Sequence, residues 1–318
     1  MRVVFFGTPA FAVPSLQALI DSRHVVAGVV TQPDKPRGRG QKVTPSPVKH
    51  AAAARGIPVL QPDRLRDSGF LDELRNLSPD LGVVAAYGKI LPPDVLSLPR
   101  LGLINVHASL LPRWRGAAPI HRAILAGDTV TGVTIMRVVQ ALDAGPMLRV
   151  VETPIDPNET SASVESRLAS LGADLLVNVI DDMEHGPVAE APQDEAKVTY
   201  AARLSKGESA IDLSRPAADV HNTIRGLQPW PLASALLDDR RVRFLESILA
   251  PDEPSSSAAP PGTVIRIEPD ALIVSTGRGA IALRRLQLDG RPVVSVRDFL
   301  NGHDVRPGSR FLPLSPTP

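Results

Sequence analysis

Short apolar runs alternate with stretches of helical periodicity over the first 185 or so residues of this chain, and this alternation limits the possible folds most strongly. The expected strands are residues 3–6, 25–30, 58–60, 81–85, 103–106, 131–138 and 147–152. The expected helices are residues 15–21, 47–55, 70–77, 117–125 and 160–183. Strands that alternate with helices form parallel sheets, because each helix carries the chain back to the edge where the next strand begins. The pattern predicts an α/β fold with a doubly wound, largely parallel sheet.

The sequence changes character in its last third. Residues 186–202 are polar and contain prolines, which is typical of a linker. One helix-like stretch at 217–227 is then followed by short β-rich runs at 242–248, 263–267, 271–275 and 280–288. Short strands separated by Gly and Pro turns predict a small β-barrel. We therefore expect a catalytic domain over residues 1–187, a linker over 188–207 and a smaller domain over 208–318.

Composition excludes several classes of site. The chain has no cysteine, so it forms no disulfide and no thiolate metal site. Its 7 histidines lack ligand spacing such as His-x-x-x-His, and we expect no metal. No apolar run approaches the roughly 20 residues that span a bilayer, and the first residues read as a strand rather than a signal peptide. We expect a cytoplasmic protein that engages no membrane and acts as a monomer.

Polar side chains follow two of the expected strands. Asn105 and His107 stand at the carboxyl end of the apolar run 101–106, and two residues apart on a strand they share a face. Asp143 lies in the turn after the run 131–139. Ligands of open α/β sheets bind outside the carboxyl ends of the strands, so both segments are expected to face one crevice.

These residues suit the transfer of a one-carbon acyl group to an amine. Attack of a nitrogen on a formyl carbon develops negative charge on the formyl oxygen, and Asn105 and a protonated His107 can both donate to it. Asp143 would orient the imidazole, and His107 could relay a proton to the departing nitrogen. No serine or cysteine nucleophile is required, because an amine with a pKa of roughly 8 attacks unaided near neutrality.

Structural roles are the alternative for each of these residues. A lone histidine after a strand is more often structural than catalytic, and Leu142-Asp143-Ala144-Gly145 is ordinary turn chemistry. Asn105, on the same side of the strand as His107, favours the catalytic interpretation.

Longer motifs carry a resemblance to a known family. They include Asn105-x-His107, Ser109-Leu110-Leu111-Pro112, Leu142-Asp143-x-Gly145, Tyr87-Gly88-Lys89-Ile90-Leu91 and Leu204-Ser205-Lys206. In this order and spacing, over nearly the whole chain, they resemble the folate-dependent formyltransferases, and within that family the members that formylate methionyl-tRNA. The resemblance implies that the C-terminal barrel is OB-like. It also implies transfer of a formyl group from 10-formyltetrahydrofolate to the α-amino group of methionyl initiator tRNA, for translation initiation.

The resemblance assigns site residues. Asn105, His107 and Asp143 would be catalytic, and the tetrahydrofolate derivative would be held by Ser109, Leu110, Leu111, Pro112, Tyr87, Gly88, Ile90 and Leu91. This chain departs from the family pattern around Asp143, where it has Val139, Ala141 and Ala144, so the folate contacts of that turn stay open.

A basic segment, Pro33 to Lys42, would by the same resemblance grip the acceptor end of the initiator tRNA. The residues expected to bind tRNA are Arg37, Arg39, Lys42 and Lys206. Two alternatives remain: a folate-dependent formyltransferase acting on a sugar nucleotide or purine precursor, and a non-enzymatic RNA-binding module on an inactive α/β domain.

Overall fold

The computed structural model describes residues 1–37, 42–251 and 259–314. Its chain divides into two compact units. The first comprises Met1–Pro119, Thr131–Thr153 and Glu165–Ala201, and the second comprises Ile120–Val130, Pro154–Val164 and Ala202–Pro318. Much of the predicted linker, up to Ala201, therefore belongs to the first unit.

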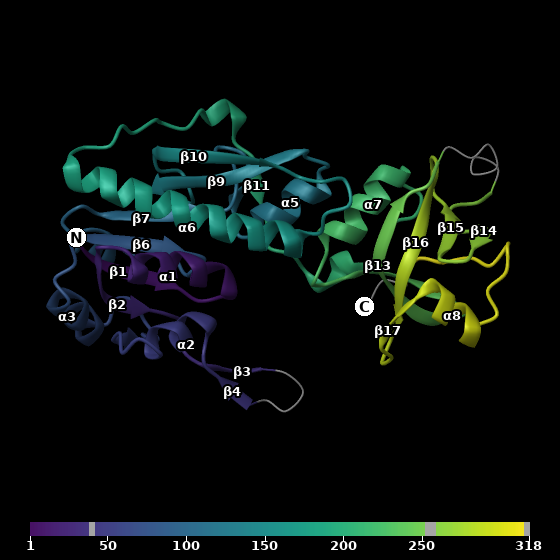
Figure 1. The fold of residues 1–318 in the computed structure, drawn as a ribbon, viewed down its shortest axis with the longest axis horizontal. Coiled ribbons are helices and arrows are strands. Elements are labelled where there is room, and N and C mark those ends of the chain that lie inside the picture. Colours follow the sequence, from purple (N-terminus) through teal and green to yellow (C-terminus); the bar gives the residue numbers. More distant parts are fainter. Residues whose placement is uncertain (38–41, 252–258, 315–318) are drawn as a thin grey trace. The chain divides into compact units, whose positions relative to one another are not determined.

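The first unit is built on a seven-stranded sheet in the order β10-β9-β7-β6-β1-β2-β5 (Figure 1). Its strands are β1 (Arg2–Gly7), β2 (Val25–Val30), β5 (Val59–Leu60), β6 (Leu81–Ala85), β7 (Leu103–His107), β9 (Val130–Arg137) and β10 (Met147–Pro154). Strand β1 runs parallel to β2 and β6, β2 to β5, and β6 to β7, whereas β7 and β9 are antiparallel. The predicted largely parallel sheet is confirmed.

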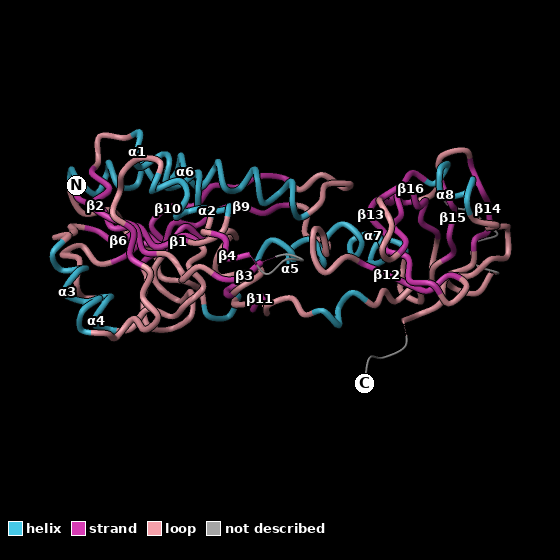
Figure 2. The backbone as a smooth tube through the Cα atoms, turned by 90° about the horizontal axis from the view of Figure 1, so that it is seen from below, coloured by secondary structure: helices cyan, strands magenta, loops and turns pink. Residues whose placement is uncertain are grey.

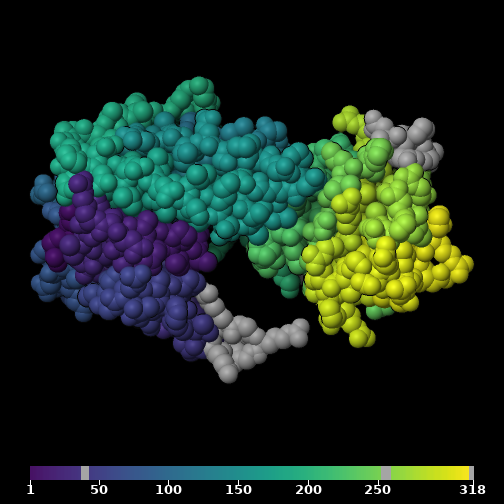
Figure 3. Space-filling view, viewed as in Figure 1, coloured from purple at the N-terminus to yellow at the C-terminus, as the bar shows by residue number. Residues whose placement is uncertain are grey.

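Helices cover both faces of this sheet. The views of Figures 1 and 2 place α1 (Val13–Asp21), α2 (Pro47–Ala53) and α6 (Ser161–His185) on one face. On the other face lie α3 (Ser68–Asn76) and α4 (Pro93–Leu96). Figure 3 shows the purple residues of the N-terminal region adjoining teal residues from the middle of the chain. The two-sided covering explains why the central strands read as continuous apolar runs rather than as alternating ones.

A fully buried cluster joins α3 and α4 to the sheet. Phe6, Leu103 and Tyr87 pack with Leu74 of α3 and Val95 of α4. The rings of Phe6 and Tyr87 meet edge to face with centroids 5.6 Å apart. On the other face α6 approaches the sheet closely, since a Cβ on Gly172 would lie 2.8 Å from a methyl carbon of Val106. The helix predicted for residues 160–183 thus packs one side against the sheet.

Two small sheets were not predicted. Strands β3 (Lys35–Arg37) and β4 (Lys42–Thr44) pair antiparallel and form a hairpin in the segment that the sequence analysis treated only as a basic loop. Strands β8 (Arg115–Gly116) and β11 (Tyr200–Ala201) pair in parallel. Through this pairing, β11 in the predicted linker is hydrogen-bonded to β8, which lies in the segment that follows His107. A short helical turn, η1 (Ala10–Ala12), precedes α1, and another, η2 (Glu195–Lys197), lies within the linker.

The second unit is a small antiparallel barrel with short helices. Its sheet runs β12-β13-β16-β15-β14, with β17 paired to β16. The elements are α5 (Pro119–Leu125), η3 (Lys206–Ser209), α7 (Ala217–Gly226), β12 (Ala233–Leu237), β13 (Arg240–Leu249), β14 (Val264–Glu268), β15 (Ala271–Ser275), β16 (Ala280–Leu288), β17 (Val293–Ser295) and α8 (Val296–Gly302). The last described segment pairs with both edge strands, because Leu312 bonds Leu236 of β12 and Ser309 bonds Val264 of β14. This pairing closes the sheet and confirms the predicted small barrel.

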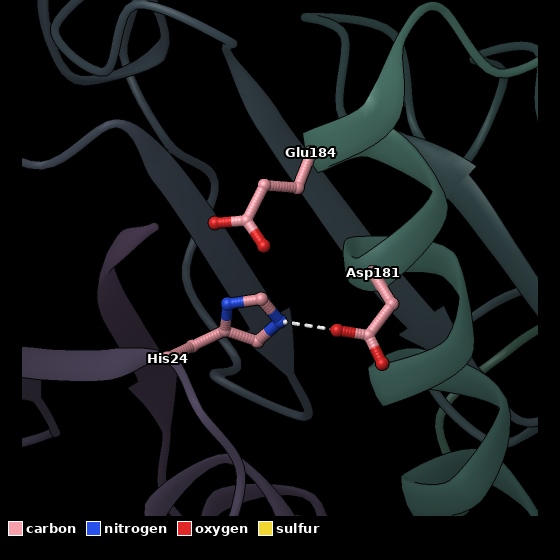
Figure 4. Close-up of side chains that lie close together, drawn as sticks. All are labelled: His24, Asp181 and Glu184. Carbon is pink, nitrogen blue, oxygen red and sulfur yellow. Dashed lines mark ion pairs between the residues drawn. The ribbon is translucent and has the colours of Figure 1, made fainter.

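An ion-paired cluster joins the start of β2 to α6 (Figure 4). The buried imidazole of His24 points toward Asp181, with Nε2 3.1 Å from Oδ1. Asp181 and Glu184, one helical turn apart on α6, also pair with Arg23 at 2.9 and 3.2 Å. The amine of Met1 donates to Glu184 at 2.9 Å. Each carboxylate already has a cationic partner, so we interpret the cluster as a polar joint between the two elements. Among the described residues, no helix is long and apolar enough to cross a membrane.

Buried histidines make the stability of the protein depend on pH. Burial lowers the pKa of His24, His121 and His221. A group with a lowered pKa binds its proton mainly in the unfolded state, so its contribution to stability is full above an unfolded pKa of about 6.5 and is lost as the pH falls through the folded value. We expect the urea midpoint to fall between about pH 7.5 and about pH 5.5. The dependence should be shallower in His221→Gln and unchanged in the exposed control His185→Gln; equal dependence in all three proteins would refute this origin.

Candidate active site

Strand β7 carries Asn105 and His107 to the carboxyl edge of the sheet. It lies between β6 and β9, so both of its sides are occupied by neighbouring strands. His107 is only 5% exposed, whereas Asn105 is partly exposed. The segment after β6, which begins near Tyr87, leaves the sheet at the same edge because β6 and β7 are parallel. The predicted catalytic and folate-binding segments therefore emerge side by side.

Both ring nitrogens of His107 face oxygen atoms. The Nε2–H group donates to the backbone carbonyl of Trp114 at 3.0 Å. Nδ1 lies 3.8 Å from Oδ2 of Asp143, a distance that suits an ion pair with a protonated imidazole and is too long for a hydrogen bond. The same carboxylate oxygen accepts a hydrogen bond from the backbone N–H of Gly116 at 2.8 Å. The carboxylate is thus fixed on the side of the ring that carries Nδ1.

The turn that presents Asp143 is held by a buried glutamine. Asp143 itself has φ of 44°, in the left-handed region that aspartate tolerates better than most residues. The side-chain amide of Gln193 donates to the carbonyls of Asp143 and Gly145, both at 2.8 Å. Its oxygen accepts from Nε of Arg115 at 2.9 Å, and Arg115 also pairs with Glu195 at 2.7 Å. This polar bridge connects the Asp143 turn to the chain that follows His107.

Sequence reasoning missed the residues of this bridge. Gln193 and Glu195 lie in the stretch interpreted as a linker, and their bonds to Arg115 and the Asp143 turn span 48 to 80 residues. Thr199 of the same stretch accepts a hydrogen bond from the backbone N–H of Trp114 at 2.9 Å. The local sequence offered one signal for these contacts, Arg115, which follows the segment Ser109-Leu110-Leu111-Pro112. If its guanidinium is buried, it requires polar partners elsewhere in the chain.

The segment Ser109-Leu110-Leu111-Pro112 is anchored to β9. The hydroxyl of the buried Thr134 donates to the carbonyl of Ser109 at 2.7 Å and accepts from the backbone N–H of Leu111 at 3.2 Å. The Ser109 hydroxyl donates to the carbonyl of Arg113, also at 2.7 Å. These bonds hold the backbone of the turn at Ser109 and Leu111.

Tyr87 and Gly88 contribute backbone rather than side chain to the edge of the sheet. The Tyr87 side chain is 1% exposed within the core, and burial raises its pKa to about 12. Its carbonyl accepts a hydrogen bond from the side-chain amide of Gln32 at 2.8 Å. Gly88 has φ of +79°, and a Cβ there would lie 2.9 Å from the Gln32 amide nitrogen. The position therefore disfavours any residue with a side chain.

A cavity of about 450 Å³ lies beside this turn. Its lining includes Ile90 and Leu91 after the turn, and Gln140 from the loop that leads to Asp143. Leu91 is buried, while Ile90 is 78% exposed. The volume lies within the range of roughly 300–1,000 Å³ found for small-molecule pockets. The two apolar side chains proposed as a pocket wall thus border a cavity of suitable size.

The described residues among those expected to bind tRNA come from both units. Arg37 ends β3 and Lys42 begins β4, so they occupy facing positions of the hairpin. Arg39 lies outside the described residues. Lys206 is exposed at the start of η3 in the second unit.

Comparison with known proteins places the chain in a family. A profile described as Formyl transferase matches residues 1–180, and one described as Formyl transferase, C-terminal domain matches residues 203–304. The methionyl-tRNA formyltransferase of Sulfurihydrogenibium sp. (strain YO3AOP1) is 44% identical over 98% of this chain and 100% of its own length. That of Pseudomonas putida (strain GB-1) is 48% identical over 95% of this chain and 96% of its own.

Solved structures show the same fold at low identity. The sugar 3N-formyl transferase WlaRD has a TM-score of 0.68 at 18% identity and covers 92% of this chain and 99% of its own. The N-formyltransferase of Helicobacter canadensis also has a TM-score of 0.68 at 18% identity, over 89% of this chain and 98% of its own. The family profiles and the full-length relatives at 44–48% identity go beyond fold. The chain belongs to the formyl transferase family, and within it to the methionyl-tRNA formyltransferases.

Proposed function

We propose that this protein transfers the formyl group of 10-formyltetrahydrofolate to the α-amino group of methionine esterified to initiator tRNA. The observation that carries the proposal is the approach of His107 and Asp143 at the carboxyl edge of the sheet, with Asn105 two residues earlier on β7. Full-length relatives named methionyl-tRNA formyltransferase support it. Its product would be the formylated initiator used in translation initiation.

In this reaction a bond forms between the methionine nitrogen and the formyl carbon, and the bond from that carbon to N10 of the folate breaks. We assign the Asn105 amide and the imidazolium of His107 to the negative charge that develops on the formyl oxygen. The amine loses one proton and N10 gains one, and His107 relays it. Asp143, whose Oδ2 lies 3.8 Å from Nδ1, is assigned to keep the imidazole in its orientation.

His107 has to change one hydrogen-bond partner to act in this way. Its Nε2–H group donates to the Trp114 carbonyl, while Nδ1 faces Asp143. We infer that Nε2 exchanges this carbonyl for the formyl oxygen as charge develops there. An anionic oxygen is the stronger acceptor, since charge-assisted hydrogen bonds are about twice as strong as neutral ones.

The folate derivative is proposed to bind along the two turns that border the edge of the sheet. Neighbours with the same fold support this class of ligand: WlaRD was crystallised with 5-N-formyl-THF, and HypX from Aquifex aeolicus in complex with tetrahydrofolic acid. The backbone of Tyr87 and Gly88 and the turn from Ser109 to Pro112 would meet the pterin. Ile90 and Leu91 would cover it from the adjoining cavity.

We propose that tRNA is bound by the hairpin segment with Arg37, Arg39 and Lys42, and by Lys206 with the C-terminal barrel. Residues 1–187 would then be the catalytic domain, 188–207 the connecting segment and 208–318 the tRNA-binding domain. The proposal also places the enzyme in the cytoplasm as a monomer free of membranes, which light scattering and cell fractionation can test.

The decisive experiment offers several acceptors to the purified protein with 10-formyltetrahydrofolate. Charged initiator tRNA should be formylated, and charged elongator tRNA, an amino-sugar nucleotide and a purine-precursor amine should react far more slowly. Preference for a sugar nucleotide would favour the alternative of a sugar-modifying enzyme. That alternative has less support, since the solved sugar formyltransferases are only 18% identical to this chain.

A further inference from the structure

A network of polar side chains lies at the carboxyl end of β2, between the hairpin β3–β4 and the turn after β6. Gln32, just after β2, donates its side-chain amide to the carbonyl of Tyr87 at 2.8 Å. The hydroxyl of Thr8 donates to the same carbonyl at 3.3 Å and accepts from the backbone N–H of Gln32 at 3.4 Å. The proposed folate-binding turn is therefore held from the ends of β1 and β2.

The entry to the hairpin is tied to the same glutamine. Asp34 immediately precedes β3, and its carboxylate pairs with the ammonium group of Lys49 at 2.6 Å. The side-chain amide of Gln61 donates to Asp34 at 2.8 Å and to the backbone carbonyl of Gln32 at 3.0 Å, while its oxygen accepts from Lys49 at 2.7 Å. The hydrogen bond from Lys49 lowers the pKa of Asp34.

The exit of the hairpin is anchored too. Ser46, which follows β4, accepts a hydrogen bond from the backbone N–H of Lys49 at 3.0 Å and so caps α2. Its hydroxyl lies 2.8 Å from that of Thr31, and both residues are buried. Both ends of the hairpin are thus bonded to the residues that follow β2, one of which holds the Tyr87 carbonyl.

We propose that Gln32 and Gln61 are positioning residues that keep the folate-binding turn and the tRNA-binding hairpin in one shared arrangement, so that each ligand favours binding of the other. This inference rests on the proposed function, which supplies the two ligands. Gln61 makes both of its donor contacts only when Asp34 and Gln32 are in place together. A ligand that fixes either end therefore stabilises the arrangement that the other ligand needs, and the effect is reciprocal.

The test measures binding of 5-formyltetrahydrofolate, which carries no formyl group on N10, by calorimetry with and without saturating methionyl initiator tRNA. In the wild-type protein tRNA should lower the Kd of the folate at least about fivefold. In Gln61→Ala and Gln32→Ala this ratio should fall toward one. Gln17→Ala is the matched control, because Gln17 donates at 2.7 Å to the exposed Asp21 of its own helix. It should keep the wild-type ratio.

Two results would overturn the inference: a wild-type Kd that tRNA leaves unchanged, or variants that retain the full ratio. Thermal melting identifies a variant that has lost its fold. If either Gln61→Ala or Gln32→Ala is unfolded, the ratio of folate Kd values is taken from the other glutamine variant. The proposed function is assessed separately, by formylation of charged initiator tRNA by the wild-type protein. An active enzyme without coupling refutes the positioning role alone, whereas an inactive wild-type protein refutes the proposed function.

Discussion

Replacement of His107 by alanine is expected to lower kcat for formyl transfer by about 10²–10⁴, because it removes both a donor to the developing oxyanion and the proton relay. The imidazole is 5% exposed, and its two nitrogens face the Trp114 carbonyl and the Asp143 carboxylate. The KM values for tRNA and folate should change far less than kcat, since the proposed interactions strengthen only as charge develops.

Single-turnover rates with charged initiator tRNA would measure the effect, and circular dichroism would verify the fold. His185→Ala is the matched control: this histidine is exposed on α6 and bonds only to the carbonyl of Asp181 in its own helix. The control should keep the wild-type rate. A His107→Ala protein that turns over at a near-normal rate would remove the histidine from the mechanism.

The strands and helices of the first unit were predictable because local periodicity determines them. The run 81–85 coincides with β6, and the bounds of the helix predicted over 160–183 agree with those of α6 to within one helical turn. The hairpin β3–β4 was missed because its segment is rich in proline, glycine and basic residues, whereas strand prediction depends on apolar alternation. Its ends are fixed by Asp34 and Ser46 through contacts that no local pattern encodes.

The candidate site was predictable in part for the same reason. Asn105 and His107 share a strand, so their proximity follows from a period of two residues. The prediction that Asp143 lies near His107 depended on the general rule that ligands bind outside the carboxyl ends of the strands. This rule places both residues at one edge of the sheet but gives no distance between them. Gln193 could not be found, because its three bonds join positions far apart in the chain and its local sequence is ordinary for a linker.

Replacement of Gly145 by alanine is expected to lower kcat by roughly 10², because it displaces the turn that presents Asp143. A Cβ at this position would lie 2.0 Å from the backbone carbonyl oxygen of Arg137, which cannot move without disturbing the end of β9. The Gly145 carbonyl also accepts one of the two hydrogen bonds that Gln193 donates to this turn. We expect destabilisation of about 1–3 kcal/mol, as for other overpacked positions, together with the loss of rate.

Urea unfolding and steady-state kinetics separate the two effects. Gly302→Ala is the control, since a Cβ there meets nothing within 4 Å among the described residues and the residue ends α8 in the second unit. Stability and rate should both stay at wild-type values in the control. We expect the Gly145→Ala protein to stay slow even where urea unfolding shows it to be fully folded. The position of the Asp143 carboxylate relative to Nδ1 of His107, and not the population of native protein, would then limit the reaction. Full wild-type kcat in folded Gly145→Ala would mean that formyl transfer tolerates a displaced turn, and Asp143 would then have no role in orienting His107.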